Sequence, residues 1–284
     1  MSATDTAGGA PLAGWRAHVA ALLRRFPLLA RSGLGPAYLR WQRSRRRAAR
    51  RAAEARGDTG RSRPALFDMD RKLDRWIGDV RGGFFVEAGA NDGFEQSNTY
   101  HLERFRDWAG LLVEPTPHLH REACLERPGS RVVRAALCAP EQHGEEVTLR
   151  YGGLMTLVAG AKGSPEADAA YLAGAFALGL EAPTTFTAPA RTLSSLLDAM
   201  QAPEIDLMSL DVEGFEPQVL AGLDLDRHAP RYLLVELRDD AARAAVERRV
   251  EGRYRFCEQL SPHDFLFARA DQPAGRQDEK SAMP

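Results

Sequence analysis

The segment of residues 83–114, GFFVEAGANDGFEQSNTYHLERFRDWAGLLVE, constrains the fold more than any other part of the chain. One apolar run, FFV, ends in Glu87, and a second, LLV, ends in Glu114. Between them lie a turn of small residues, in which Gly89 and Gly93 let the backbone bend sharply, and a segment of helical apolar spacing. The segment predicts strand, turn, helix and strand, which is half of a doubly wound α/β domain with a ligand site at the end of its first strand.

The residue types of this turn favour a nucleoside ligand. Glu114 follows Gly93 by 21 residues and ends the next strand, where a carboxylate can accept both hydroxyls of a ribose. The turn lacks the third glycine of GxGxxG, and no Walker lysine follows it, so NAD and nucleoside triphosphates are disfavoured. S-adenosyl-L-methionine (SAM) is the common nucleoside without a pyrophosphate. The alternative is a tight strand–helix turn beside an incidental acid.

The formal net charge of −1 conceals two parts of opposite charge. Residues 1–63 hold 14 Arg and 3 acids, a net +11, whereas the remainder holds 24 Lys and Arg and 36 acids, a net −12. We therefore predict a basic, partly helical or disordered extension over 1–63, a domain over 64–272 and a tail over 273–284. The extension is either a solvated helix or tail, or a segment that binds an anionic membrane surface. Nucleic acid is the least favoured partner, because no nucleic-acid-binding fold surrounds the basic run.

The cysteines and the hydropathy pattern predict a cytoplasmic protein. Cys124, Cys138 and Cys257 are widely spaced, which argues against a zinc site and a disulfide framework and fits a reducing compartment. No run of 18 apolar residues exists, and no signal-peptide layout opens the chain. Peripheral attachment to a membrane through the basic extension stays open.

Beyond the first segment, strands alternate with helices, which predicts a mostly parallel sheet. The expected elements are short amphipathic helices over 15–41 broken at Pro27 and at 33–36, a basic helix over 40–56, helices over 64–80, 118–126, 193–198 and 239–251, strands over 131–138, 146–151, 185–190, 205–210 and 232–236, and a closing hairpin over 254–259 and 264–270. The stretch 152–183 is rich in Ala and Gly, and it is a candidate lid insertion over a substrate pocket or, equally, a mobile surface excursion.

A second group of acids follows the strand expected over 205–210. Asp211 and Glu213 are two residues apart, so their side chains point the same way, and Gly214 permits another close turn. Glu236 ends the next strand at the same edge of the sheet. A carboxylate at a buried edge is costly unless it is paired or used, so four successive strands that end in acids indicate a functional edge.

Several segments in order resemble the FkbM family of SAM-dependent methyltransferases, over about residues 84–270. The matching segments are VEAGANDGFEQSNTYHLER, GLLVEP, RTLSSLLD, IDLMSLDVEGFEPQVLAGL and YLLVE, and two of them resemble the branch that also includes the domain of Star-like proteins. The resemblance implies a class I methyltransferase (Rossmann-like) α/β fold, doubly wound, with a mostly parallel sheet and a C-terminal antiparallel hairpin. It also implies methyl transfer from SAM, usually to a hydroxyl of a sugar, a glycan or a natural product.

The resemblance also assigns site residues. The implied cofactor-binding residues are Glu87, Gly89, Ala90, Asn91, Asp92, Gly93, Asn98, Glu114, Pro115, Ala136 and Asp211. Asp211 is the first candidate for a general base, Glu213 the second and His263 a distant third. We predict no metal, because no His-rich or multi-Asp cluster supports one. The alternative function is a nonenzymatic membrane-associated or scaffolding module that keeps the fold; an NAD-dependent oxidoreductase is weakened by the missing third glycine.

Overall fold

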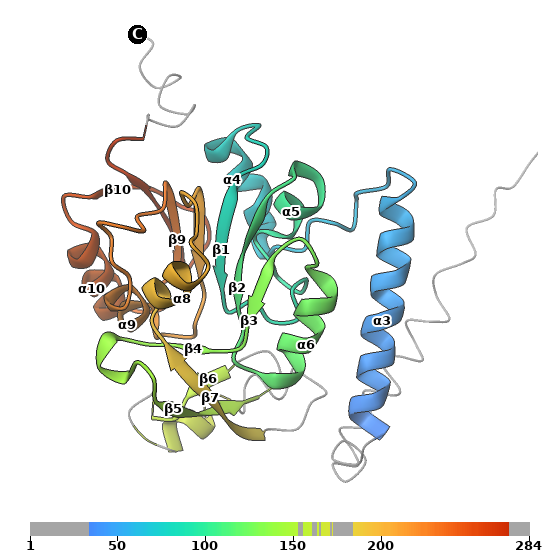
Figure 1. Cartoon of the computed structure of the whole chain (residues 1–284), viewed down its shortest axis with the longest axis horizontal. Helices are drawn as coiled ribbons and strands as arrows, with labels where there is room; N and C mark the ends of the chain where they lie inside the picture. The colour runs from blue at the N-terminus through green and yellow to red at the C-terminus, as the bar shows by residue number, and fades with distance from the viewer. Residues whose placement is uncertain are drawn as a thin grey trace, which may run out of the picture.

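The computed structural model describes residues 34–152, 156–160, 164, 166–170, 172 and 184–272. The predicted tail over 273–284, the helices predicted before residue 34 and most of the candidate lid lie outside the described residues. The described part of the chain contains a seven-stranded central sheet and a four-stranded second sheet, with helices on both faces of the first (Figure 1).

The central sheet confirms the predicted mostly parallel architecture with a closing antiparallel hairpin. Its strands, in spatial order, are β10 (Tyr254–Gln259), β11 (Asp264–Arg269), β9 (Tyr232–Glu236), β8 (Leu207–Leu210), β1 (Phe84–Ala88), β2 (Ala109–Val113) and β3 (Arg131–Val133). The pairs from β9 to β3 are parallel, and β11 runs antiparallel to both β9 and β10. The order reverses between β1 and β8, which is where ligands bind in open α/β sheets.

Two helical layers bury the two faces of this sheet. The helices α8 (Leu193–Ala199), α9 (Glu216–Ala221) and α10 (Asp240–Val250) pack on one face, and α4 (Met69–Ile77) and α5 (Tyr100–Arg106) pack on the other. Successive side chains of a strand point to opposite faces, so Val86 joins the first layer and Phe85 the second. The helix α6 (Pro117–Glu126) connects β2 to β3.

The strand predicted over 131–138 is wrong as a single strand, because the chain bends after β3. The second half becomes β4 (Ala136–Leu137), which pairs with β7 (Thr184–Arg191) instead of β2. The second sheet is completed by β5 (Glu146–Tyr151) and β6 (Thr156–Val158), in the order β4-β7-β5-β6, and the 3-10 helix η2 (Pro140–Gln142) lies between β4 and β5. The strand β3 lies at an edge of the central sheet, so the chain can leave that sheet there and still satisfy its backbone groups against β7.

The helix predicted over 64–80 is also wrong in its first part. A 3-10 turn, η1 (Leu66–Asp68), precedes α4, and both Phe67 (φ 53, ψ 27) and Asp68 (φ 53, ψ 34) adopt the left-handed conformation. The apolar spacing of α4 continues back through Leu66 and Phe67, which explains the prediction, but these two side chains are exposed whereas Leu73 is buried.

The basic run predicted as a helix forms α3 (Leu34–Glu54), with Pro36 in its first turn rather than in a break. The helix lies beside α6 (Figure 1). Arg47 donates to Glu122 and Glu126, and Arg50 also donates to Glu126, so α3 is tied to the domain by ion pairs that are mostly buried. Within the described residues, no helix combines the length and apolar character needed to cross a membrane.

Candidate active site

A cavity of about 290 Å³ opens at the carboxyl ends of β1, β2, β8 and β9. Its volume lies near the lower end of the roughly 300–1,000 Å³ typical of small-molecule sites. Its wall includes the turn after β1, the turn after β8, the segment 135–137, parts of β5 and β6, the η1 turn and the β10–β11 turn. The two turns that the sequence singled out therefore meet at one site.

Gly89 is required where these two turns meet. Its φ is +80°, and a Cβ at this position would lie 1.9 Å from the carbonyl oxygen of Asp211. The Asp211 backbone N–H donates to the carbonyl of Ala88 at 3.2 Å, so β1 and β8 remain paired up to the rim of the cavity. Only glycine leaves room for this approach, which fixes the predicted cofactor turn beside the predicted base.

Glu114 is held in position by the backbone. Its two carboxylate oxygens accept hydrogen bonds from the N–H groups of Asn91 (2.9 Å) and Thr116 (2.8 Å), and its side chain lines the cavity. Burial raises the pKa of Glu114 to about 7. A carboxylate offers about four acceptor positions, so the two N–H donors leave acceptor capacity for the vicinal hydroxyls of a ribose. This arrangement fits the role predicted for Glu114.

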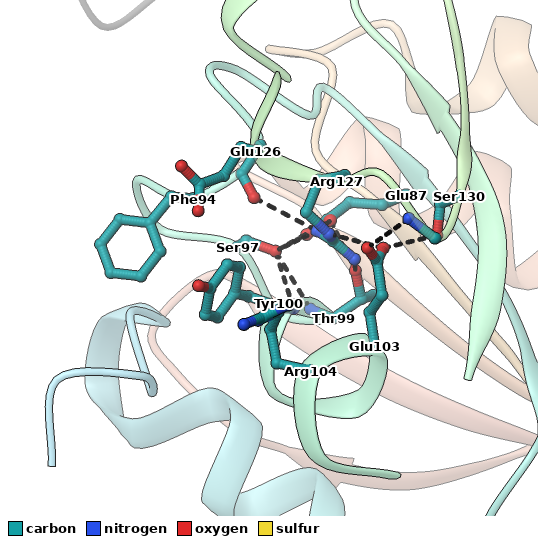
Figure 2. A network of polar contacts seen from close by, with 12 residues as sticks. Glu87, Phe94, Ser97, Thr99, Tyr100, Glu103, Arg104, Glu126, Arg127 and Ser130 are labelled. Atoms are coloured by element: carbon teal, nitrogen blue, oxygen red, sulfur yellow. Dashed lines mark hydrogen bonds and ion pairs between the residues drawn. The ribbon is translucent and has the colours of Figure 1, made fainter. Parts of the chain in front are cut away.

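Glu87 lines the cavity, and its hydrogen bonds join it to a network of polar side chains (Figure 2). Its carboxylate accepts from the Ser97 hydroxyl, the Thr99 hydroxyl and the Asn98 N–H at 2.7–3.0 Å. The fully buried guanidinium of Arg127 lies 3.2 Å from the same carboxylate. Glu87 therefore anchors the segment 97–99, in addition to the predicted contact with the methionine part of SAM.

Arg127 contacts several groups of this network, and the sequence analysis did not single it out. It also donates to Glu103 at 2.8 Å and to the Thr99 hydroxyl at 2.9 Å, and Figure 2 shows it between these groups. Arg127 lies 40 residues after Glu87 and follows α6, so no local pattern signals the pair. The ion pair forms only because β1 and the end of α6 meet in the fold.

The network continues from the cofactor turn to α3. The Arg50 guanidinium lies over the Phe94 ring, 3.4 Å from its centroid, and donates to the Tyr100 hydroxyl at 3.0 Å. Tyr100 in turn donates to Glu54 at 2.9 Å. The helix that belongs to the predicted extension thus supports the cofactor turn from behind.

Most of the predicted cofactor residues line the cavity, and two do not. The lining set is Glu87, Gly89, Ala90, Asn91, Asn98, Glu114, Pro115, Ala136 and Asp211. Asp92 and Gly93 lie outside this lining and instead shape the turn. The Asp92 carboxylate accepts from two backbone N–H groups, and a Cβ at Gly93 would lie 2.9 Å from the Arg127 side chain.

Carboxylates gather on the other side of Gly89. Asp211, Glu216 and Glu236 each bring an oxygen within 4.8 Å of the others. Glu216 accepts from the N–H groups of Val212 and Gly214 at 2.9 and 3.1 Å, and burial raises its pKa to about 6. Asp211 is exposed toward the cavity, and the surrounding protein together with the charges of Glu236 and Glu213 raises its pKa above the usual value. This spacing alone does not define a metal site, and the absence of a metal stays a prediction.

Arg238 contacts two acids, Glu236 of this cluster and the nearby Glu213. It donates to both oxygens of Glu236, at 2.8 and 3.0 Å, and lies 3.2 Å from Glu213. The predicted second candidate base, Glu213, is therefore paired, whereas Asp211 faces Glu236 and the cavity. The sequence did not single out Arg238, although it directly follows the strand that ends in Glu236.

Residues in the left-handed conformation surround the cavity. Among the described residues, seven non-glycine residues have positive φ, and four of these line the cavity: Phe67, Asn91, Gln96 and Glu213. Such conformations cost on the order of 1–3 kcal/mol each and concentrate at ligand sites. The sequence had indicated neither Phe67 nor Gln96.

Comparisons with known proteins identify the class. The Methyltransferase FkbM domain family matches residues 87–267, which is more than half of the chain. Solved structures similar to the chain include a TehB-like SAM-dependent methyltransferase from Corynebacterium glutamicum (12% identity, 80% of this chain and 98% of that chain, TM-score 0.38) and a human methyltransferase 10 domain containing protein (13%, 74% and 83%, 0.40). No curated protein sequence matches the chain.

The sheet order, the glycine turn and the strand-end acids define a class I methyltransferase architecture. The chain belongs to the Methyltransferase FkbM domain family. Its cofactor is accordingly SAM. Glu114, held by two backbone N–H groups, and Ala136 both line the cavity, where we predict that they contact the ribose and the adenine. The resemblance to the branch with Star-like proteins stays a prediction.

Proposed function

We propose that the protein transfers the methyl group of SAM to a hydroxyl oxygen of a sugar, a glycan or a natural product. The observation that carries the proposal is the place of Asp211. Its carboxylate lies at the cavity beside the cofactor turn, with Glu236 as its acidic neighbour. A hydroxyl must lose its proton as its oxygen is methylated, and a carboxylate of raised pKa is a better proton acceptor near neutral pH than an ordinary one.

In this proposal, different residues of the chain bind the cofactor and accept the proton. Glu114 holds the ribose, the segment 89–91 lies along the methionine part, and Ala136 with its neighbours lines the adenine. SAM, when bound, would supply a methyl group on a positively charged sulfur, with S-adenosylhomocysteine as the leaving group. Asp211 accepts the hydroxyl proton, and Glu236, held by Arg238, sets the proton affinity of Asp211. Since positioning supplies much of the rate in such a displacement, the turn after β1 also contributes to the rate in this proposal.

The experiment measures S-adenosylhomocysteine (SAH) released by wild type and Asp211→Asn with a panel of sugar and natural-product alcohols. Loss of a general base lowers kcat by about 100- to 10,000-fold, whereas SAH affinity is expected to fall much less, because Glu114 and the turn after β1 are unchanged. Glu247→Gln, an exposed acid on α10 that pairs with Arg243, is the control and keeps full activity. Undiminished turnover by Asp211→Asn would contradict the assignment of the base.

We also propose that α3 brings the enzyme to an anionic membrane surface. Arg47 and Arg50 face the domain, whereas Arg40, Arg45 and Arg46 are exposed and Trp41 is 49% exposed. The Arg45 guanidinium lies 5.2 Å from the Trp41 ring centroid. Basic side chains beside an exposed aromatic match an anionic interface. All three cysteines are free, which supports the predicted cytoplasmic location.

Sedimentation with vesicles tests this surface. Wild type is expected to sediment with vesicles containing phosphatidylserine and not with pure phosphatidylcholine. The triple variant Arg40→Gln, Arg45→Gln, Arg46→Gln is expected to lose about 3 kcal/mol of binding, at about 1 kcal/mol per arginine. The control removes three exposed arginines elsewhere: Arg71→Gln, Arg81→Gln, Arg248→Gln. Equal loss in both variants, or binding of wild type to DNA but not to vesicles, would contradict the proposal.

A further inference from the structure

Two adjacent apolar side chains stand exposed in the wall of the cavity. Leu66 is 50% and Phe67 58% exposed, and both line the cavity, as does the buried Met69. Single exposed apolar residues are ordinary on a protein surface. A consecutive pair at a binding cavity is different, because large apolar side chains in such a wall are in a position to contact a ligand. These residues lie before the segment that the family match covers.

The backbone holds Phe67 out of the core by a strained turn. A bulky residue with φ 53° is an outlier, and Asp68 beside it has the same conformation. The turn ends at α4, whose Leu73 is fully buried against the sheet and whose Lys72 donates to the carbonyl of Leu260. A continuous helix would have carried the apolar stripe of α4 back through Leu66. The strain persists because α4 is anchored on one side of the turn.

The same anchor joins α4 to another segment of the cavity wall. Leu260 opens the β10–β11 turn, which contributes Ser261, His263 and Asp264 to the cavity wall. Asp264 lies on β11 opposite Glu236 on β9, which connects this turn to the carboxylates around Asp211. An apolar pair and a group of hydrogen-bond acceptors therefore line the same cavity.

The apolar pair and the carboxylates of the cavity wall together indicate which kind of ligand can bind. Ionised carboxylates accept hydrogen bonds and repel anions, so they require a ligand with several donors. Arg238 offsets the charge of Glu236 and Glu213, which favours neutral hydroxyls over an ammonium group. An aromatic face packs well against the flat apolar side of a ring. A pyranose presents both features: hydroxyls at its edge and C–H groups on its faces.

We propose that the Leu66–Phe67 turn is the acceptor platform of this enzyme, on which the C–H face of a pyranose ring packs while its hydroxyls donate to the carboxylates near Asp211. The inference rests on the proposed function, because it assigns the second substrate of the same cavity. It names Phe67 as a residue that determines acceptor specificity and takes no part in the proton transfer.

Saturation-transfer NMR on the full chain saturated with SAH tests this platform. The probes are methyl α-glucopyranoside, methyl α-mannopyranoside and methyl α-rhamnopyranoside, with cyclohexylamine as a ring of similar size that carries an ammonium group. At least one glycoside is expected to receive saturation on its ring protons and to bind more tightly than cyclohexylamine. Phe67→Asn, a residue that tolerates the left-handed turn, is expected to weaken that binding about 2- to 12-fold, the range of an aromatic contact. Phe67→Tyr keeps the ring and is expected to retain the affinity.

The controls separate the possible failures. Phe256→Asn replaces another phenylalanine, 49% exposed on β10 and outside the cavity lining, and is expected to change nothing. SAH binding without any glycoside binding, tighter binding of cyclohexylamine, or unchanged affinity in Phe67→Asn would overturn the platform and leave the proposed function standing. No SAH binding by wild type would overturn both.

Discussion

The carboxylates at the ends of β1 and β2 differ from those at the ends of β8 and β9 in the groups that they contact. After β1 and β2, the carboxylates are bonded to donors: Glu87 to hydroxyls and Arg127, and Glu114 to two backbone N–H groups. After β8 and β9, Asp211 instead faces another carboxylate, that of Glu236. The first arrangement holds the turn that we predict to bind the cofactor. The second raises the pKa of Asp211, which suits its proposed role as a general base.

Replacement of Arg127 is expected to have the largest effect, a loss of unfolding free energy at the first arrangement. Arg127→Met leaves Glu87 and Glu103 buried without their shared counter-charge, which is expected to cost about 3–5 kcal/mol of unfolding free energy. Arg81→Met is the control, because its pair with Asp107 is exposed and is expected to contribute about 0–1 kcal/mol. Urea unfolding at neutral pH measures both. Similar losses in the two variants would show that the network is not the support of the cofactor turn.

Replacement of Glu236 is expected to have a smaller effect, a shift in the pH profile of kcat that tests the second arrangement. Asp211 acts as a base only when deprotonated, so methyl transfer is expected to rise with pH through its raised pKa and then level off. Glu236→Gln removes a neighbouring negative charge, which lowers the pKa of Asp211 and moves the rising limb to lower pH. The pH profile of kcat, with Glu247→Gln as the control, measures the shift. A limb that moves to higher pH or stays in place would contradict the coupling.

The sequence predicted the glycine turns better than the side chains that support them, for a physical reason. The strand, glycine turn and strand-end acid around Gly89 are local features, and residues near one another in the chain determine their geometry. The supports of that turn are not local: Arg127 reaches Glu87 from the end of α6, and Arg50 reaches Phe94 from α3. Side-chain pairs so distant in the chain have no signature in a single sequence.

The errors in the fold have the same origin. The segment predicted as one strand over 131–138 splits because its second half pairs with β7, a strand some 50 residues later in the chain. The apolar spacing before α4 predicted helix through Leu66 and Phe67, but the anchored α4 and the strained turn place them at the cavity. In both places a tertiary contact overrides a local preference.

Calorimetric titration of SAH into wild type, Glu114→Gln and Glu95→Gln tests the cofactor site. Wild type is expected to bind, with affinity that rises as the pH rises through about 7, because the ribose hydroxyls favour the ionised Glu114. Glu114→Gln is expected to bind about 10- to 150-fold more weakly, the equivalent of a charge-assisted hydrogen bond, without this pH dependence. Glu95→Gln, exposed at the cavity, keeps the affinity. Failure of wild type to bind SAH, or equal binding by Glu114→Gln, would contradict the cofactor site.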